Sequence, residues 1–126
     1  MKNTEMLKKN YEFNTVLKYG KSYHGKYYSI FFLKTKKEKN GLGIAISKKI
    51  AGSVERNRLK RLVRESYREI EEKLIENSDI VVLVNKKYTK NTEQIDFEKT
   101  IRDFYKIFTS ARLIIAKRKI NEENYN

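Results

Sequence analysis

Cationic side chains are concentrated in one short segment of the chain, residues 48–68. This segment holds eight Lys and Arg residues against two acids, a net charge of +6, whereas the whole chain of 126 residues carries +13. The eight cations are Lys48, Lys49, Arg56, Arg58, Lys60, Arg61, Arg64 and Arg68. Nearly half of the charge surplus thus lies in 21 residues. A solvated helix face does not require such a density, which predicts a polyanionic partner.

The positions of these cations around a helix sharpen the prediction. At about 100° per residue, one arc collects five polar residues: Asn57, Lys60, Arg61, Arg64 and Arg68. A separate arc collects the residues expected to face the core: Leu59, Leu62, Val63, Ser66 and Ile70. Arg58 falls at the margin, where we expect its stem to lie along the protein and its guanidinium to point outward.

Two further features favour nucleic acid as the partner. The helix dipole disfavours cations in the first turns, where Arg56, Arg58 and Lys60 lie, so stability alone does not account for them. A guanidinium also binds phosphate through two parallel hydrogen bonds and stacks on bases. A membrane-binding helix would instead expose Trp, Phe or Leu. A solvated structural helix and a membrane-surface helix are the alternative interpretations.

The rest of the composition argues against a catalytic site. The chain has no cysteine, which removes disulfides, zinc thiolates and thiol nucleophiles and suits a reducing, cytoplasmic compartment. The single histidine, His24, has no carboxylate cluster near it in the sequence, so neither a metal site nor a general base is predicted. Four glutamates spread around one helix as a solvated face does: Glu69, Glu71, Glu72 and Glu76. We expect no intrinsic metal or cofactor, no signal peptide and no membrane span.

Hydrophobic spacing predicts the elements that position the basic helix. Helices are predicted over residues 10–20, 54–77 and 97–113, with Asn10 and Ser53 as caps of the first two and Gly20 as the stop of the first. Strands are predicted over residues 27–35, 42–47 and 79–85, with a short one near 22–24.

The connections between these elements predict the sheet. Asn40-Gly41 is a turn signal, so the strands 27–35 and 42–47 should pair as an antiparallel hairpin. The helix 54–77 should bridge two parallel strands, 42–47 and 79–85. The fold class is α+β: a single-domain sandwich of a mixed sheet of about four strands and three helices, in the order αβββαβα. We expect one domain over residues 1–126, ordered over about 7–116, with frayed ends.

The segment SKKIAGSVERNRLKRLVRE, residues 47–65, resembles the signature of the bacterial ribonuclease P protein subunit, centred on Arg56-Asn57-Arg58. The likeness continues upstream in KKNYEFNTVLKYGKSYHGKYYSIFF, residues 8–32, and covers most of residues 7–116. It implies a left-handed crossover around the motif helix. It also implies a large catalytic RNA as partner, which with bound Mg²⁺ removes the 5′ leader of precursor tRNA. The protein would assist this reaction in the cytoplasm, without a DNA or membrane partner.

The resemblance also assigns roles to individual residues. The catalytic RNA would contact Arg56, Asn57, Arg58, Lys60, Arg61 and Arg64, with Lys48 and Lys49 extending the same surface. Arg68 is added from its place on the helical wheel. A cleft between the first helix and the sheet would hold the leader, and the matching residues are Phe13, Leu17 and Phe31. Aromatic rings stack on bases of any sequence, which is the physical reason for this assignment.

The chain departs from the family pattern at two places. Leu17 stands where the family often has an aromatic residue, so apolar contact would replace stacking there. Residues 50–54 differ from the common pattern before the triplet, which affects the loop but not the helix.

Another RNA-binding module, such as a ribosomal protein, is the alternative function. A DNA-binding helix-turn-helix fits less well, because the residues immediately before the basic helix read as strand and loop and not as a preceding helix. An independent metallonuclease fits less well, because the chain shows no convergent carboxylates or histidines.

Overall fold

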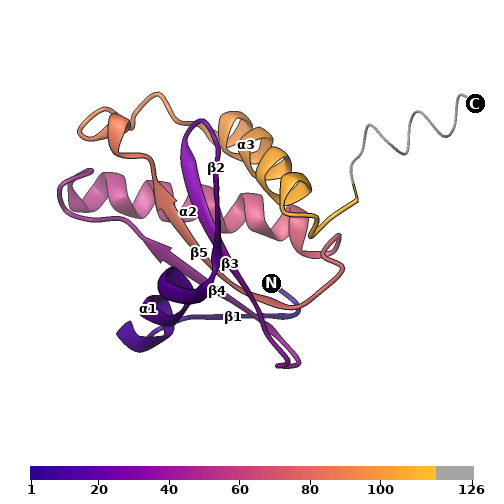
Figure 1. The fold of residues 1–126 in the computed structure, drawn as a ribbon. Helices are drawn as coiled ribbons and strands as arrows, with labels where there is room; N and C mark the ends of the chain where they lie inside the picture. The colour runs from indigo at the N-terminus through magenta and orange to yellow at the C-terminus, as the bar shows by residue number, and fades with distance from the viewer. Residues whose placement is uncertain (116–126) are drawn as a thin grey trace, which may run out of the picture.

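The computed structural model describes residues 1–115, which form one mixed sheet and its covering helices (Figure 1). The strands are β1 (Thr4–Met6), β2 (Lys21–His24), β3 (Tyr28–Lys34), β4 (Asn40–Ala45) and β5 (Ser78–Val84). The α-helices are α1 (Asn10–Tyr19), α2 (Ser53–Glu71) and α3 (Phe97–Ser110), and a 3-10 helix, η1, covers Lys86–Tyr88. The predicted α+β class with three helices is confirmed. The sheet has five strands, one more than the expected four.

The strand order in the sheet is β1-β4-β5-β3-β2. β4 runs parallel to both of its neighbours, β1 and β5. β3 runs antiparallel to β5 and to β2. Because α2 connects β4 to the parallel β5, the prediction of a helix bridging two parallel strands is confirmed.

The predicted hairpin between β3 and β4 is wrong, because β5 lies between these two strands. β5 is apolar on both of its faces, so it is stabilised most where both faces are covered, at the centre of the sheet. Asn40 and Gly41 do not form a turn but begin β4. The side-chain oxygen of Asn40 accepts a hydrogen bond from the N–H of Ser78 at 2.9 Å. The amide that suggested a turn therefore joins the first residues of β4 and β5.

The structure also contains a strand that the sequence did not indicate, β1, which precedes the expected start of order at about residue 7. Glu71 at the end of α2 anchors it. Its carboxylate accepts hydrogen bonds from the N–H of Lys2 at 2.8 Å, from the N–H of Asn3 at 3.2 Å and from the hydroxyl of Thr4. Because α2 ends at Glu71, it is shorter than the predicted helix 54–77. Residues 116–126, including the expected frayed C-terminal end, lie outside the described residues.

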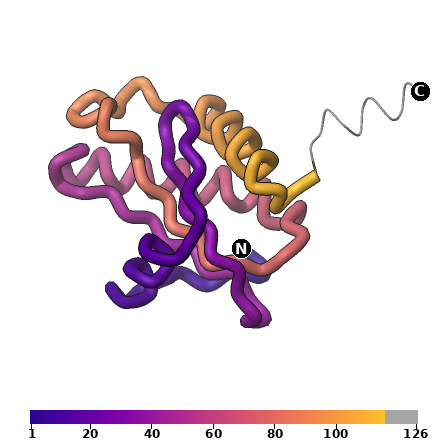
Figure 2. The backbone as a smooth tube through the Cα atoms, viewed as in Figure 1, coloured from indigo at the N-terminus to yellow at the C-terminus, as the bar shows by residue number. Residues whose placement is uncertain are grey.

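The two faces of the sheet carry different cores. α2 and α3 cover one face, where Tyr28 and Ile30 of β3 are fully buried in the larger core. α1 covers the other face, where its Val16 packs against Val81 of β5 in a smaller cluster. Figure 2 shows α1 on the side of the sheet away from α3. The smaller cover leaves part of the second face open, and this is where a ligand can approach.

Candidate nucleic-acid interface

The exposed flank of α2 carries the cations that the helical wheel grouped together. Arg61 and Arg68 are exposed, and Lys60 and Arg64 are half-buried. Lys48 and Lys49 are exposed in the turn that precedes the helix. Among residues 1–115, no ion pair involves any of these six side chains. We call them the open cationic flank: Lys48, Lys49, Lys60, Arg61, Arg64 and Arg68.

The opposite side of α2 faces the core, as predicted, with two differences. Leu59, Val63 and Ile70 are fully buried. Tyr67, which the wheel did not place in this arc, is also fully buried, and Leu62 is only partly buried. Asn57, in the middle of the Arg56-Asn57-Arg58 triplet, is exposed. The helix therefore divides into a core side and a solvent side as its spacing predicts.

Arg58 differs from the flank, because its guanidinium is bound within the protein. Its Nε and Nη2 donate to the two carboxylate oxygens of Glu55 at 2.6 and 2.8 Å. Nη2 also donates to the carbonyl oxygen of Thr92 at 3.0 Å, and Nη1 to that of Ile95 at 2.8 Å. The expectation that this guanidinium points outward is wrong. Arg58 ties the start of α2 to the segment that leads into α3.

The carboxylate of Glu55 is the centre of this cluster. The Arg58 hydrogen bonds lower the pKa of Glu55 against the opposing effect of burial, and the hydroxyl of Thr92 donates a further bond at 2.6 Å. The same contact with Glu55 raises the pKa of Arg58. Arg56 is also partly engaged, because its Nη1 donates to the carbonyl oxygen of Ala51 at 2.9 Å. Two cations of the motif thus have partners inside the protein.

A cleft of about 500 Å³ lies between α1 and the open face of the sheet. Phe13 and Leu17 line it from α1, as the sequence predicted. Its floor contains Ala45 of β4 and Leu83 of β5. Phe31 of β3 packs in the same apolar cluster as Phe13 and Leu17, but it does not line the cleft itself.

Three polar residues line the cleft that the sequence did not assign to it: Asn10, which was predicted only as a helix cap, Asn14 on α1, and Ser47 after β4. The two asparagines share one helical face with Phe13 and Leu17, because all four follow i, i+3, i+4, i+7 spacing. That spacing could have indicated them. Ser47 lies in a loop, and no periodicity points to a loop residue.

Gly43 of β4 sets how deeply the cleft's aromatic residue sits. A Cβ added at this position would lie 2.5 Å from Cε1 of Phe13, closer than real contacts allow. The ring of Phe13 therefore rests directly on the backbone of β4. The sequence pattern of this strand, large alternating with small residues, did not reveal that its glycine receives a side chain from α1.

Lys60 belongs to both surfaces. It is part of the open cationic flank of α2 and also lines the cleft beside Ser47. The sequence had assigned it only to contact with a catalytic RNA. The flank and the cleft are therefore contiguous, so one ammonium group can be reached from either side.

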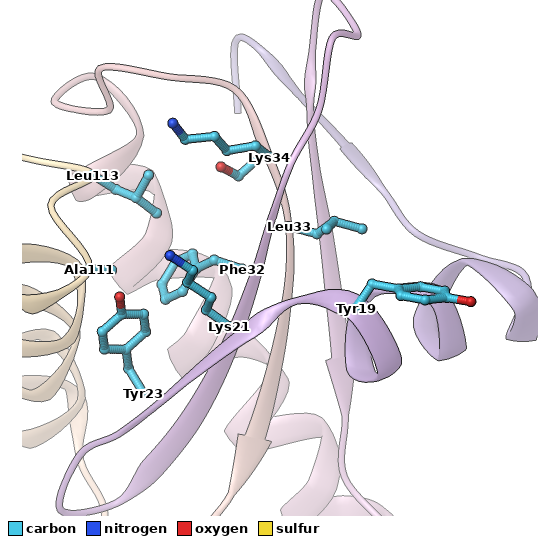
Figure 3. Close-up of a pocket in the computed structure, with 9 residues that line it drawn as sticks. Tyr19, Lys21, Tyr23, Phe32, Leu33, Lys34, Ala111 and Leu113 are labelled. Carbon is cyan, nitrogen blue, oxygen red and sulfur yellow. The ribbon is translucent and has the colours of Figure 1, made fainter.

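A second hollow, of about 350 Å³, lies between β2, β3 and the end of α3 (Figure 3). Lys21, Tyr23 and Leu113 surround it. Lys34 at its edge pairs with Glu76 at 3.0 Å, which offsets part of its positive charge. None of the residues predicted from the sequence lines this hollow, so it does not belong to the candidate interface.

Two properties of residues 1–115 bear on other functions. No three His, Cys, Asp or Glu side chains in this part of the chain come together as a group that could hold a metal ion. None of its helices is both long and apolar enough to cross a membrane.

Comparison with known proteins places this chain in a family. A family model for ribonuclease P matches residues 1–112. A relative from Fusobacterium nucleatum, named ribonuclease P protein component, is 37% identical over 108 residues, which cover 86% of this chain and 97% of the relative. A relative of the same name from Natranaerobius thermophilus is 35% identical over 108 residues, covering 86% of this chain and 90% of the relative.

Solved structures agree with these matches. The RNase P protein from Thermotoga maritima is 32% identical and superposes with a TM-score of 0.70, covering 79% of this chain and 91% of the other. The RNase P protein of Staphylococcus aureus, at 23% identity, shares the fold with a TM-score of 0.74 over 86% of this chain and 96% of the other. These matches favour ribonuclease P over a ribosomal protein. Since the family model covers nearly the whole described chain, the chain belongs to the ribonuclease P protein family.

Proposed function

We propose that this chain binds the catalytic RNA of ribonuclease P through the open cationic flank of α2. The observation that carries the proposal is that six cations on one surface have no ionic partner among residues 1–115. Like charges crowded together destabilise a fold unless an anion offsets them, and closely spaced phosphates do so. The proposed contact surface also includes Arg56, Asn57 and Arg58. Arg58 can contribute only those N–H groups that its hydrogen bonds within the protein leave free.

We propose that the cleft between α1 and the sheet holds the single-stranded 5′ leader of precursor tRNA. Its lining is largely apolar, with the ring of Phe13 resting on β4, and it also includes three polar side chains and the positively charged Lys60. A base that stacks on an aromatic side chain gains about 1–3 kcal/mol whatever its sequence. Leu17 would contribute apolar contact rather than stacking, and Phe31 packs in the apolar cluster that supports Phe13 and Leu17. A leader held here would lie beside the RNA bound on α2.

The chemistry of leader removal is proposed to belong to the RNA. The Mg²⁺ that the reaction needs is proposed to be held mainly by the RNA partner, because phosphate oxygens are the ligands that this ion commonly takes. The protein's part would be to offset repulsion between two RNAs and to hold the leader. We propose the cytoplasm as the place of this reaction, since a chain without cysteine suits a reducing compartment.

Reconstitution of the chain with transcribed catalytic RNA tests this proposal. We expect the protein to raise precursor-tRNA cleavage at low Mg²⁺ and to show no nuclease activity without RNA. Arg61→Gln should weaken binding to the catalytic RNA and reduce the slope of its salt dependence by roughly one unit for each phosphate left unneutralised. Arg102→Gln is the matched control, because it removes the same charge from an exposed position on α3.

Two results would contradict the proposal. Activity that persists after every trace of RNA is removed would show a nuclease in the protein. Equal losses in Arg61→Gln and Arg102→Gln would show that net charge, and not the flank of α2, determines binding.

A further inference from the structure

The floor of the cleft continues across the sheet beyond the part that α1 covers. Strand register places four residues in one row: Ala45 of β4, Leu83 of β5, Ser29 of β3 and His24 of β2. Ala45 and Leu83 line the cleft, and the row ends at His24 on the outermost strand. Adjacent strands lie about 4.8 Å apart, so His24 is about 10 Å from Leu83. A strand of RNA seated in the cleft can reach that far.

The row's last two residues belong to a chain of hydrogen bonds whose directions are fixed. The side-chain nitrogen of Asn85 donates to the carbonyl oxygens of Gly25 and Lys26, both at 2.9 Å. Its oxygen must therefore face Ser29, whose hydroxyl donates to it at 2.7 Å. With its proton used, the Ser29 oxygen can only accept, and Nδ1 of His24 lies 2.8 Å away. His24 consequently carries a proton on Nδ1.

This arrangement leaves one ring atom of His24 without a partner in the network, Nε2. Since the proton is on Nδ1, Nε2 of the uncharged ring is a hydrogen-bond acceptor. The side chain is exposed, and Ser29 holds the ring at the end of the row. From the sequence, neither a metal site nor a general base was predicted at His24.

We propose that Nε2 of His24 accepts a hydrogen bond from the RNA strand bound in the cleft, from a ribose 2′-hydroxyl or a nucleobase N–H. This inference rests on the proposed binding of the leader in that cleft. Phosphate is not the assigned ligand, because an unprotonated nitrogen has no proton to donate to it. Lys26 and Lys106 line a hollow together with His24, and their ammonium groups are better suited to phosphate. The third charged residue of that hollow, Asp103, is held by backbone N–H groups.

The test uses the reconstituted complex with precursor tRNA at pH 8, where histidine is normally uncharged. We expect His24→Ala to weaken binding of precursor tRNA about fivefold, the usual effect of one hydrogen bond, and to leave binding of leaderless tRNA unchanged. Ser29→Ala removes the hydrogen bond that orients the His24 ring, so the single variant should bind precursor tRNA two- to threefold more weakly than the wild type. Added to His24→Ala, the same substitution should cause no further loss. Ser22→Ala, one row away on the same face of β2, is the matched control and should have no effect.

Substitutions in the leader identify the donor. If one 2′-deoxy substitution in the leader weakens binding as much as His24→Ala does, and the two together weaken it no further, the donor is that 2′-hydroxyl. If one base substitution behaves in this way, the donor is the N–H of that nucleobase. If no leader position couples to His24, or if the loss appears at pH 6 but not at pH 8, the proposal is wrong, because the ring then binds nothing or binds phosphate in its charged form.

Phe13→Ala separates this inference from the proposed function. If Phe13→Ala weakens binding of the leader and His24→Ala does not, the cleft stands and the inference fails. If neither substitution affects it, the leader lies elsewhere and both fail. Thermal unfolding of His24→Ala should match the wild type, so a lower Tm would also count against a direct contact.

Discussion

Replacing Arg58 by Met tests whether this arginine stabilises the fold or binds RNA. Methionine retains an apolar stem of similar length but has none of the guanidinium's donors. The substitution removes the hydrogen bonds to Glu55, to the carbonyl of Thr92 and to the carbonyl of Ile95. Because these bonds hold residues 92–95 against the start of α2, we expect the substitution to destabilise the native state.

The expected size follows from the exposure of the pair. A hydrogen bond to a charged group contributes about 1.5–3 kcal/mol where it is shielded, whereas an exposed ion pair contributes about 0.2–1 kcal/mol. The side chains of Arg58 and Glu55 are 36% and 27% exposed, so water replaces part of what the substitution removes. We expect the free energy of unfolding to fall by about 2 kcal/mol, which lowers Tm by roughly 8 °C in a domain of this size.

The pH dependence of this effect has a definite sign. The pKa of Glu55 in the folded protein lies below its ordinary value of 4.5. The carboxylate therefore stabilises the fold fully above pH 4.5, and this contribution is lost as the pH falls through the folded pKa. The difference in unfolding free energy between wild type and Arg58→Met should shrink below pH 4.5.

Urea unfolding at pH 7 and pH 3 measures both effects, and Arg61→Met is the control. Arg61 is exposed and has no ion pair among residues 1–115, so its replacement should change stability by less than about 0.5 kcal/mol. The reasoning would be refuted if Arg58→Met kept the wild-type stability and bound RNA as weakly as Arg61→Met does. The guanidinium would then leave its internal partners to bind RNA.

Three further substitutions test other contacts. Gly43→Ala should push the ring of Phe13 off β4 and weaken leader binding about tenfold, measured by fluorescence anisotropy, while leaderless tRNA binds as before. Glu71→Gln should release β1, seen as faster hydrogen exchange at residues 2–6 with unchanged exchange in β5. Burial raises the pKa of Glu71, but its hydrogen bonds outweigh burial and lower the net pKa, so wild-type β1 should loosen in the same way below pH 4.5. Asp103→Ala should cost about 4 kcal/mol in urea unfolding, because it leaves three backbone N–H groups at the β2–β3 turn without an acceptor.

Periodicity predicted the elements well where each carries a long amphipathic or apolar run. The cores of α2, α3 and β5 lie where their hydrophobic spacing placed them, and most ends agree to within a residue or two. Two helices end earlier than predicted: α2 ends at Glu71 and not near residue 77, and α3 ends at Ser110 and not near residue 113. The residues after Glu71 retain helix-compatible types, so a stop set by tertiary contacts leaves no mark in the sequence.

Pairing between strands was the part that sequence could not predict. Asn40-Gly41 has the composition of a hairpin turn, yet the buried amide of Asn40 binds Ser78, far away in the chain. A local signal cannot report a partner 38 residues away. β1 was missed for a similar reason: its three residues carry no pattern, and Glu71 and β4 hold it in place. Both errors come from contacts that only the folded chain brings together.

The candidate site was predictable residue by residue only where side-chain type and helical position decide the outcome. Helical spacing placed Lys60, Arg61, Arg64 and Arg68 on one flank of α2. The α1 wall of the cleft, Phe13 and Leu17, was assigned only through the resemblance to the family. The row that ends at His24 depends on strand register, and register cannot be read when the pairing of strands is unknown. Phe31 is a second example: the sequence does not show which face of β3 packs against α1, and only the structure places Phe31 on that face.

The hydrogen bonds of Arg56 and Arg58 change the electrostatic argument for RNA binding. Cations in the first turns of a helix oppose its dipole, which suggested that an anion docks at the start of α2. The structure supplies that compensation internally, through the carboxylate of Glu55 and through backbone carbonyls at Ala51, Thr92 and Ile95. The start of α2 therefore does not require RNA. The cations without an ionic partner among residues 1–115 lie in the preceding turn and from Lys60 onward, so phosphates should gather along the open cationic flank, where Lys60 also lines the cleft.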